Sequence, residues 1–125
     1  MSAVAKPSRP DPVRLARLKT RPEFLRAARG RSKAAPGLIL QGWRRSAEEA
    51  PGVIRIGFTC SKKVGNAVAR NRAKRRLRAV ATEVLAFEGK PGWDYVLIGR
   101  RDVTVSRPYP LLLADLAGAL SRVHG

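Results

Sequence analysis

Residues 61–90 read SKKVGNAVARNRAKRRLRAVATEVLAFEGK and predict the longest helix of the chain, from about Ala67 to Ala86. One narrow apolar stripe runs along this helix, because apolar residues recur at alternating intervals of four and three positions. The stripe consists of Ala73, Leu77, Val80, Val84 and Phe87. Asn66 is a suitable N-cap, and residues 89–92, rich in glycine and proline, end the helix. We therefore expect one face of the helix to pack against a core.

Almost every position outside the stripe is cationic. Eight lysines and arginines occupy the seventeen residues from Lys62 to Arg78, and no acid lies between Glu49 and Glu83. The eight are Lys62, Lys63, Arg70, Arg72, Lys74, Arg75, Arg76 and Arg78. Like charges four residues apart destabilise an isolated helix, whereas an ordinary solvated helix alternates its charges. Because guanidinium groups bind phosphate through paired hydrogen bonds, the pattern predicts a nucleic-acid partner.

The arrangement of these cations favours RNA over DNA. They cover nearly all of the exposed circumference of the helix, whereas a helix that reads a DNA major groove presents a narrower edge. An architectural DNA-binding protein would carry apolar wedge residues, which we do not find in this sequence. A folded RNA, in which several backbones converge, fits the pattern better. The free backbone amides at the start of the helix, after Gly65, add a further site for an anion.

The composition agrees with a polyanionic partner. The chain has 125 residues, with 26 Lys and Arg against 9 Asp and Glu, and a formal net charge of +17. Such a length builds one core, so we predict a single domain over residues 13–125 after a disordered basic arm over residues 1–12. No apolar run approaches the roughly 20 residues that span a bilayer. Without a secretory signal either, the chain is expected to be cytoplasmic and to make no membrane contact.

Few residues could carry chemistry. Cys60 is the single cysteine and His124 the single histidine, which excludes a disulfide framework, a multi-cysteine zinc site and a pair of catalytic histidines. Cys60 ends an apolar alternation, so a buried and unreactive thiol is expected. None of the nine acids lies in the basic stretch. We therefore predict no catalytic residue, no metal site and no bound cofactor in the protein itself.

Order is predicted to begin at Thr20. Thr20 and Glu23 fit a capping box for a short helix that carries Phe24. Gly30 is expected to close this helix in a left-handed conformation. The sequence leaves open whether residues 31–33 add a short edge strand.

Three further strands and a last helix complete the pattern. Residues 38–43 and 53–60 predict antiparallel neighbours, joined by a solvated connection at 46–52. Residues 95–99 form a continuous apolar run, which is typical of a central strand buried on both faces. A last helix starts near Pro110. Its buried residues are expected to be Leu113, Leu116, Leu120 and Val123. The order helix, strands, long basic helix, strand, helix predicts a two-layer α/β sandwich.

The run from Ser61 to Arg78 closely resembles the signature of the bacterial ribonuclease P protein subunit, whose centre is the Arg-Asn-Arg triplet present here at 70–72. The surrounding sequence agrees with that family at several positions. They are Phe24, Gly30, Gly57, Phe58, Asp94, Tyr95, Val96 and Arg100. The resemblance covers about residues 15–123.

The resemblance implies an α/β fold like that of certain ribosomal proteins, with a left-handed βαβ crossover around the long helix. Members of the family assemble, one protein to one large catalytic RNA, into an endoribonuclease that removes the 5′ leader of precursor tRNA. The chemistry belongs to the RNA and its magnesium ions, and no other protein partner is required. The basic helix and the loop before it contact the RNA in this family. The matching positions here are Lys62, Lys63, Asn66, Arg70, Asn71, Arg72, Lys74, Arg75 and Arg76.

The family also holds the single-stranded leader in a cleft between the first helix and the sheet. Many relatives line this cleft with two aromatic residues four positions apart, but this chain has Phe24 and then Ala28. Leader binding is therefore expected to use Phe24 together with Arg55 and Thr59. Core packing is the alternative role for Phe24. For the whole protein, the alternative is a ribosomal or RNA-chaperone type of RNA-binding protein, equally small and basic.

Overall fold

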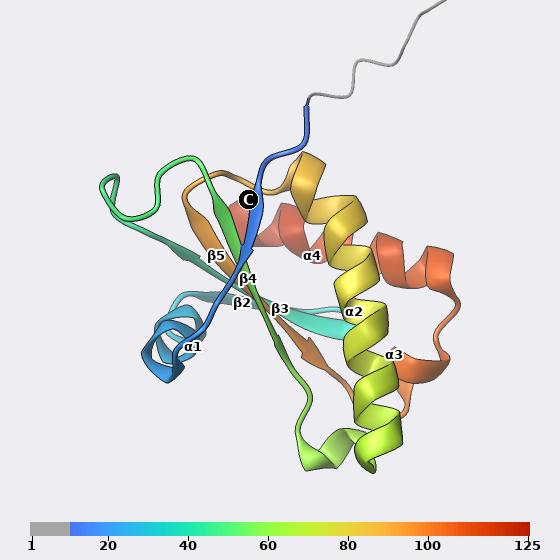
Figure 1. The fold of residues 1–125 in the computed structure, drawn as a ribbon. Coiled ribbons are helices and arrows are strands. Elements are labelled where there is room, and N and C mark those ends of the chain that lie inside the picture. Colours follow the sequence, from blue (N-terminus) through green and yellow to red (C-terminus); the bar gives the residue numbers. More distant parts are fainter. Residues whose placement is uncertain (1–10) are drawn as a thin grey trace, which may run out of the picture.

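A five-stranded sheet forms the centre of the structure, in the order β1-β4-β5-β3-β2 (Figure 1). The computed structural model describes residues 11–125, so the predicted arm over residues 1–12 lies outside the described residues apart from its last two. The elements are β1 (Leu15–Arg17), α1 (Arg21–Ala28), β2 (Arg31–Ala34), β3 (Leu38–Arg44), β4 (Ile54–Thr59), the 3-10 turn η1 (Lys62–Val64), α2 (Ala67–Glu88), β5 (Trp93–Gly99), α3 (Val103–Ser106) and α4 (Tyr109–His124).

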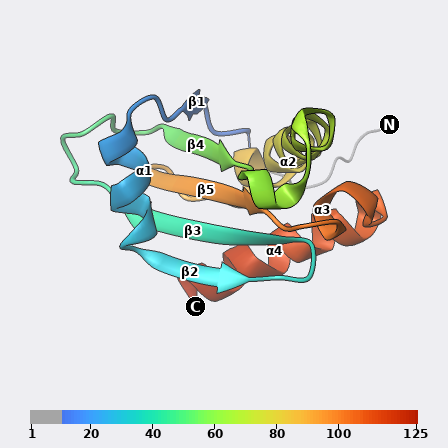
Figure 2. The same cartoon turned by 90° about the horizontal axis from the view of Figure 1, so that it is seen from below.

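Helices cover the two faces of the sheet unequally. α2 and α4 pack on one face, where Leu40, Ile54 and Leu97 belong to the main core (Figure 2). The short α1 lies on the opposite face, where Ala27 and Val96 form part of a smaller apolar cluster. The predicted α/β sandwich is thus confirmed, with α1 giving the second face only partial cover.

The strand order corrects one prediction. β3 and β4 were expected to be neighbours, but β5 lies between them, antiparallel to β3 and parallel to β4. Its four residues from Asp94 to Leu97 are buried, because β5 is covered on both faces and both edges. α2 therefore forms the crossover between two adjacent parallel strands. The left-handed sense of that crossover stays a prediction.

Regular structure begins before Thr20, where order was predicted to begin. β1 precedes Thr20 and pairs parallel to β4, with Leu15 opposite Ile54 and Arg17 opposite Ile56. A strand of three residues at a sheet edge is too short to show a hydrophobic period, which explains why the sequence pattern did not indicate it. The Glu23 half of the predicted capping box is confirmed, since Glu23 Oε1 accepts hydrogen bonds from Thr20 N (2.9 Å) and Lys19 N (2.8 Å).

Gly30 has a different role from the one predicted. The helix α1 ends at Ala28, its C-cap residue Arg29 has a right-handed conformation, and Gly30 is not among the described residues with positive φ. A Cβ at Gly30 would lie 2.1 Å from the carbonyl oxygen of Gly42. Glycine is needed here because the chain crosses β3 at close range on its way into β2, the edge strand that the sequence left open.

The two long helices agree closely with expectation. Asn66 caps α2, and its Oδ1 accepts a hydrogen bond from Ala69 N at 2.9 Å. In α4, Leu112 is fully buried and Leu113 only partly, contrary to the prediction. Leu112 lies against the backbone of Gly37, where a Cβ would lie 2.6 Å from Leu112 Cδ1, and this contact helps to bury it. No helix within residues 11–125 is long and apolar enough to cross a membrane.

Candidate nucleic-acid interface

The apolar stripe of α2 determines which of its cations face outward. Ala73, Leu77 and Val80 are completely buried against the sheet and α4. Arg72 and Arg75 consequently lie on the exposed side of the helix. Within the described residues, no cation from Lys62 to Arg78 forms an ion pair with a carboxylate. The structure thus presents a row of unneutralised positive charge to its surroundings.

The loop before α2 extends this basic surface. Lys62 and Lys63 are exposed on η1, which Ser61 caps by accepting a hydrogen bond from Lys63 N at 3.2 Å. Gly65 joins η1 to α2 with a φ of 148°, in the region that disfavours side chains. Asn66 is exposed, its amide oxygen is used in capping, and its NH₂ group remains available to a partner. The two lysines, the helix start and the arginines of α2 follow one another along the chain with no acidic residue between them.

Two of the predicted contact arginines also make side-chain hydrogen bonds inside the protein. Arg76 is partly buried, and its terminal nitrogens donate to the backbone oxygens of Val105 (2.7 Å) and Arg107. It therefore fastens α2 to the segment around α3. Arg70 Nη1 donates only a long 3.4 Å hydrogen bond to the Gly65 oxygen, which leaves most of its guanidinium free.

The aromatic ring of Phe24 lies against the backbone of β4. A Cβ at Gly57 would be 2.4 Å from Phe24 Cε1, so the ring occupies the space that any larger residue at position 57 would need. Phe24 is partly buried and packs against the cluster that contains Leu18. The ring also borders a pocket of about 130 Å³ that carries three cations. Its lining residues are Arg17, Leu18, Phe24, Ile56, Gly57, Phe58, Lys74 and Arg78.

The three residues predicted to bind the leader, Phe24, Arg55 and Thr59, lie on the α1 side of the sheet but differ in their surroundings. Thr59 is exposed, and it alternates with Gly57 and Arg55 toward the α1 side of β4. Arg55 is not free, since its guanidinium donates to the carboxylates of Asp94, Glu49 and Glu23 at 2.8–3.1 Å. These hydrogen bonds, the ones to Asp94 foremost, raise the pKa of Arg55.

Arg55 belongs to a cluster of six charged residues that the sequence pattern did not predict. Its members are Glu23, Arg26, Arg45, Glu49, Arg55 and Asp94. Asp94 and Arg45 are both fully buried by side chain and form an ion pair of 2.6 Å. The signal available in the sequence was an aspartate at the start of a buried strand, since such a charge needs a buried partner.

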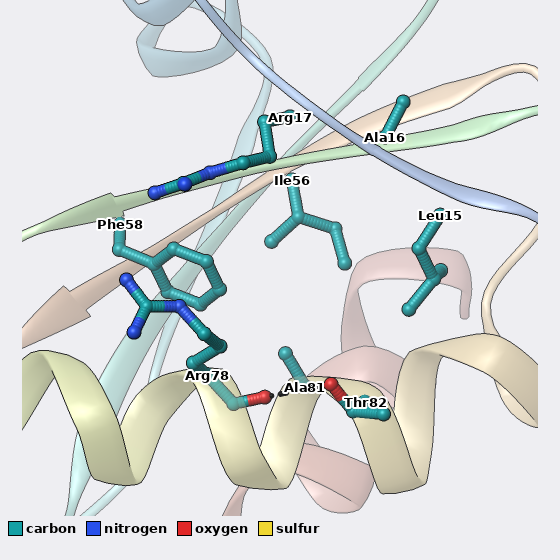
Figure 3. Close-up of a pocket in the computed structure, with 8 residues that line it drawn as sticks. All are labelled: Leu15, Ala16, Arg17, Ile56, Phe58, Arg78, Ala81 and Thr82. Atoms are coloured by element: carbon teal, nitrogen blue, oxygen red, sulfur yellow. Dashed lines mark hydrogen bonds between the residues drawn. The ribbon is translucent and has the colours of Figure 1, made fainter.

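A second pocket, of about 180 Å³, opens between β1, β4 and α2 (Figure 3). Its lining residues are Leu15, Ala16, Arg17, Ile56, Phe58, Arg78, Ala81 and Thr82. Arg78 reaches from α2 to Phe58, with its guanidinium carbon 5.6 Å from the ring centroid. Figure 3 shows Arg17 reaching toward the same ring from β1. No sequence pattern indicated this pocket, because β1 was not predicted.

Cys60 is less buried than predicted. It is partly exposed at the end of β4, and a Cβ at Gly99 would lie 2.8 Å from its Sγ. Desolvation raises the pKa of the thiol above its ordinary value. A raised pKa keeps the thiol protonated at neutral pH, the direction expected for an unreactive cysteine.

Comparison with known proteins gives one consistent family. The family model described as "Ribonuclease P" matches residues 13–124. A "Ribonuclease P protein component" from Ruegeria pomeroyi is 60% identical over 107 residues, covering 86% of this chain and 85% of the relative. A "Ribonuclease P protein component" from Paramagnetospirillum magneticum is 54% identical over 113 residues, covering 89% of this chain and 84% of the relative. A solved structure of the Staphylococcus aureus RNase P protein, 25% identical, covers 85% of this chain and 93% of its own, with a TM-score of 0.67.

Proposed function

Because the chain belongs to the ribonuclease P protein family, we propose that it is the protein component of a ribonuclease P and binds the catalytic RNA chiefly through α2. The observation that carries this proposal is the row of cations on α2 and η1 without acidic partners among the described residues. Phosphates of a folded RNA would neutralise that row, and the counterions released would favour assembly.

Eight residues are proposed to contact the catalytic RNA directly. They are Lys62, Lys63, Asn66, Arg70, Asn71, Arg72, Lys74 and Arg75. Arg76 is proposed to act from behind this surface, because its terminal nitrogens are occupied by the carbonyls of Val105 and Arg107. It would keep α2 at a constant orientation toward α3 while its neighbours hold phosphate.

The proposed complex removes the 5′ leader of precursor tRNA, with one protein for each RNA. The leader is proposed to lie between α1 and the sheet, along Phe24 and Thr59. Stacking of a base on an aromatic ring contributes about 1–3 kcal/mol, and Phe24 borders a pocket whose three cations suit a neighbouring phosphate.

A reconstitution experiment tests the proposed function. The purified full chain is mixed with the RNA subunit from the same source, and cleavage of precursor tRNA is followed against magnesium concentration. The protein is expected to lower the magnesium concentration that the RNA needs, because its cations replace counterions at the RNA surface. A chain that neither binds this RNA nor changes its magnesium requirement would contradict the proposal.

Protein freed of RNA is expected not to cleave precursor tRNA at millimolar magnesium. The acids that come together in this fold are held by arginines, as Asp94 and Glu49 show, and so are poor ligands for a metal ion. The chemistry is therefore proposed to belong to the RNA and its magnesium. The measurement is a cleavage assay on nuclease-treated, repurified protein. Leader removal that persists through this treatment would contradict the prediction.

Replacing Phe24 with alanine tests the leader site. If the ring offers a face to a base, affinity for substrates with several leader nucleotides should fall by about 1–3 kcal/mol, and affinity for mature tRNA should not change. The free energy of unfolding should fall by less than the roughly 3–5 kcal/mol of a fully buried phenylalanine. Leu25→Ala is the control, because Leu25 is exposed on the same helix. An equal loss of affinity with and without a leader would assign Phe24 to the core instead.

A further inference from the structure

The charged cluster between α1 and the sheet has equal numbers of positive and negative residues, but these residues are buried to different degrees. Three arginines face three carboxylates. Asp94 is completely buried and accepts hydrogen bonds from Arg26, Arg45 and Arg55. Glu49 lies at the outer end of the cluster, and its side chain is 35% exposed. The inner part of the cluster therefore belongs to the core, whereas Glu49 is accessible from outside.

Glu49 also belongs to a segment without regular structure. It lies in the connection between β3 and β4, where Ala50 and Gly52 both have positive φ. By contrast, Arg26 is held on α1, Arg55 on β4 and Asp94 on β5. Arg45 holds the backbone of this segment through the carbonyl oxygens of Glu49 and Ala50, so only the side chain of Glu49 has to turn away. Of the three carboxylates Glu49 is the most exposed, 35% against 22% for Glu23 and 0% for Asp94, so it leaves the arginines at the lowest cost.

The two arginines grip Glu49 as they would grip a phosphate. Arg26 forms a paired contact, with Nη1 3.1 Å from Oε1 and Nη2 2.8 Å from Oε2 of Glu49. Arg55 Nη2 donates to the same Oε2 at 2.9 Å. A phosphodiester carries the same single charge and offers two oxygens to such a fork. The buried Nε of Arg26 has no hydrogen-bond partner within the described residues.

We propose that Arg26 and Arg55 form a binding site for one phosphate of a single-stranded RNA, and that Glu49 occupies this site in the free protein. Exchange of Glu49 for a phosphodiester leaves the charge of the cluster unchanged, and both arginines keep Asp94 as a partner throughout. The inference rests on the proposed function, because it gives the leader a phosphate anchor beside Phe24. The proposal also gives Arg55 a role in leader binding, through replacement of Glu49 by a phosphate, which the sequence could not indicate.

The position of the site supports this ligand. Arg26 lies on α1, two residues after Phe24, and its guanidinium carbon is 5.7 Å from the ring centroid of Trp43. A nucleotide whose phosphate met Arg26 would have two aromatic rings on the same face of the sheet. The hydrogen bonds from Arg26 lower the pKa of Glu49. This carboxylate is therefore ionised at neutral pH and competes there with a phosphate for the two arginines.

The test compares two variants of the same loop, Glu49→Gln and Glu48→Gln. Each raises the net charge by one, but Glu48 is exposed and takes part in no ion pair within the described residues. The probe is a single-stranded pentaribonucleotide added to the full chain at constant salt. Glu49→Gln is expected to bind it about threefold to tenfold more tightly than the natural chain, because the competing carboxylate is gone. Glu48→Gln should change the affinity by less than about twofold, through screened charge alone.

Two further measurements distinguish binding at this site from a general effect of net charge and from misfolding of a variant. Adding Arg26→Ala to Glu49→Gln should abolish the gain. In the natural chain, which needs no substitution, the NMR signals of the Arg26 and Arg55 Nε–H groups should shift on addition of the pentaribonucleotide. The Nε–H of Arg107, which is paired with Asp115 far from α1, should not shift and is the internal control.

The inference is overturned if Glu49→Gln binds the oligonucleotide no better than Glu48→Gln, or if the Arg26 and Arg55 signals do not respond in the natural chain. Reconstitution with the RNA subunit distinguishes failure of the phosphate site from failure of the proposed function. A natural chain that assembles and supports leader removal, with no gain in Glu49→Gln, would contradict the phosphate site alone.

Discussion

Replacing both Arg70 and Arg72 with alanine is expected to weaken assembly with the RNA subunit by about a hundredfold or more, since each charged hydrogen bond contributes roughly 1.5–3 kcal/mol. Neither guanidinium forms an ion pair with a carboxylate within the described residues, so both are available for phosphate. The plot of log affinity against log salt should also become less steep by about two units, one for each phosphate that the variant no longer neutralises. The measurement is a binding titration over a range of salt concentrations.

The control for this pair is Arg29→Ala with Lys33→Ala. Both side chains are exposed, Arg29 just after α1 and Lys33 on the edge strand β2, so the control removes two charges from a different surface. Its salt dependence should stay close to that of the natural chain. An unchanged slope in the Arg70 and Arg72 variant, with helix content intact by circular dichroism, would remove both residues from the interface. Arg70→Lys should still weaken binding, because an ammonium group does not form the paired hydrogen bonds of a guanidinium.

Asp94→Ala is expected to have the largest effect on stability, a loss of about 3–5 kcal/mol in the free energy of unfolding, because it leaves a buried arginine without its counter-charge. The Arg45 side chain is 0% exposed, and its remaining partners are backbone oxygens. For a domain of this size, such a loss lowers the melting temperature by roughly 10–20 °C.

Urea unfolding followed by circular dichroism measures this loss. Asp115→Ala is the matched control, because Asp115 pairs with Arg107, whose side chain is 24% exposed. Its cost should be clearly smaller, since water can reach the arginine that is left. An Asp94→Ala variant that loses less than about 1 kcal/mol would show that the buried arginine finds other compensation.

The long helix was predictable because its information is local. Asn66 caps the helix through a partner three residues away, and the stripe from Ala73 to Val84 follows the helical period. The charge of its exposed face follows from the same residues. Pairing between strands is different, since it depends on residues far apart in the chain. β5 is separated from β3 by β4 and α2, yet it pairs with both β3 and β4.

The sequence by itself determined the basic face of α2, the buried stripe beneath it and the family resemblance carried by residues 61–78. Only the tertiary structure decided which arginines are available to a partner. Arg55 is paired with a carboxylate 39 positions away and Arg76 with a carbonyl 29 positions away, whereas Arg72 meets neither kind of partner within the described residues. The arginines differ in this way because folding brings each of them next to different residues. These partners lie far away in the chain, so no local sequence pattern indicates them.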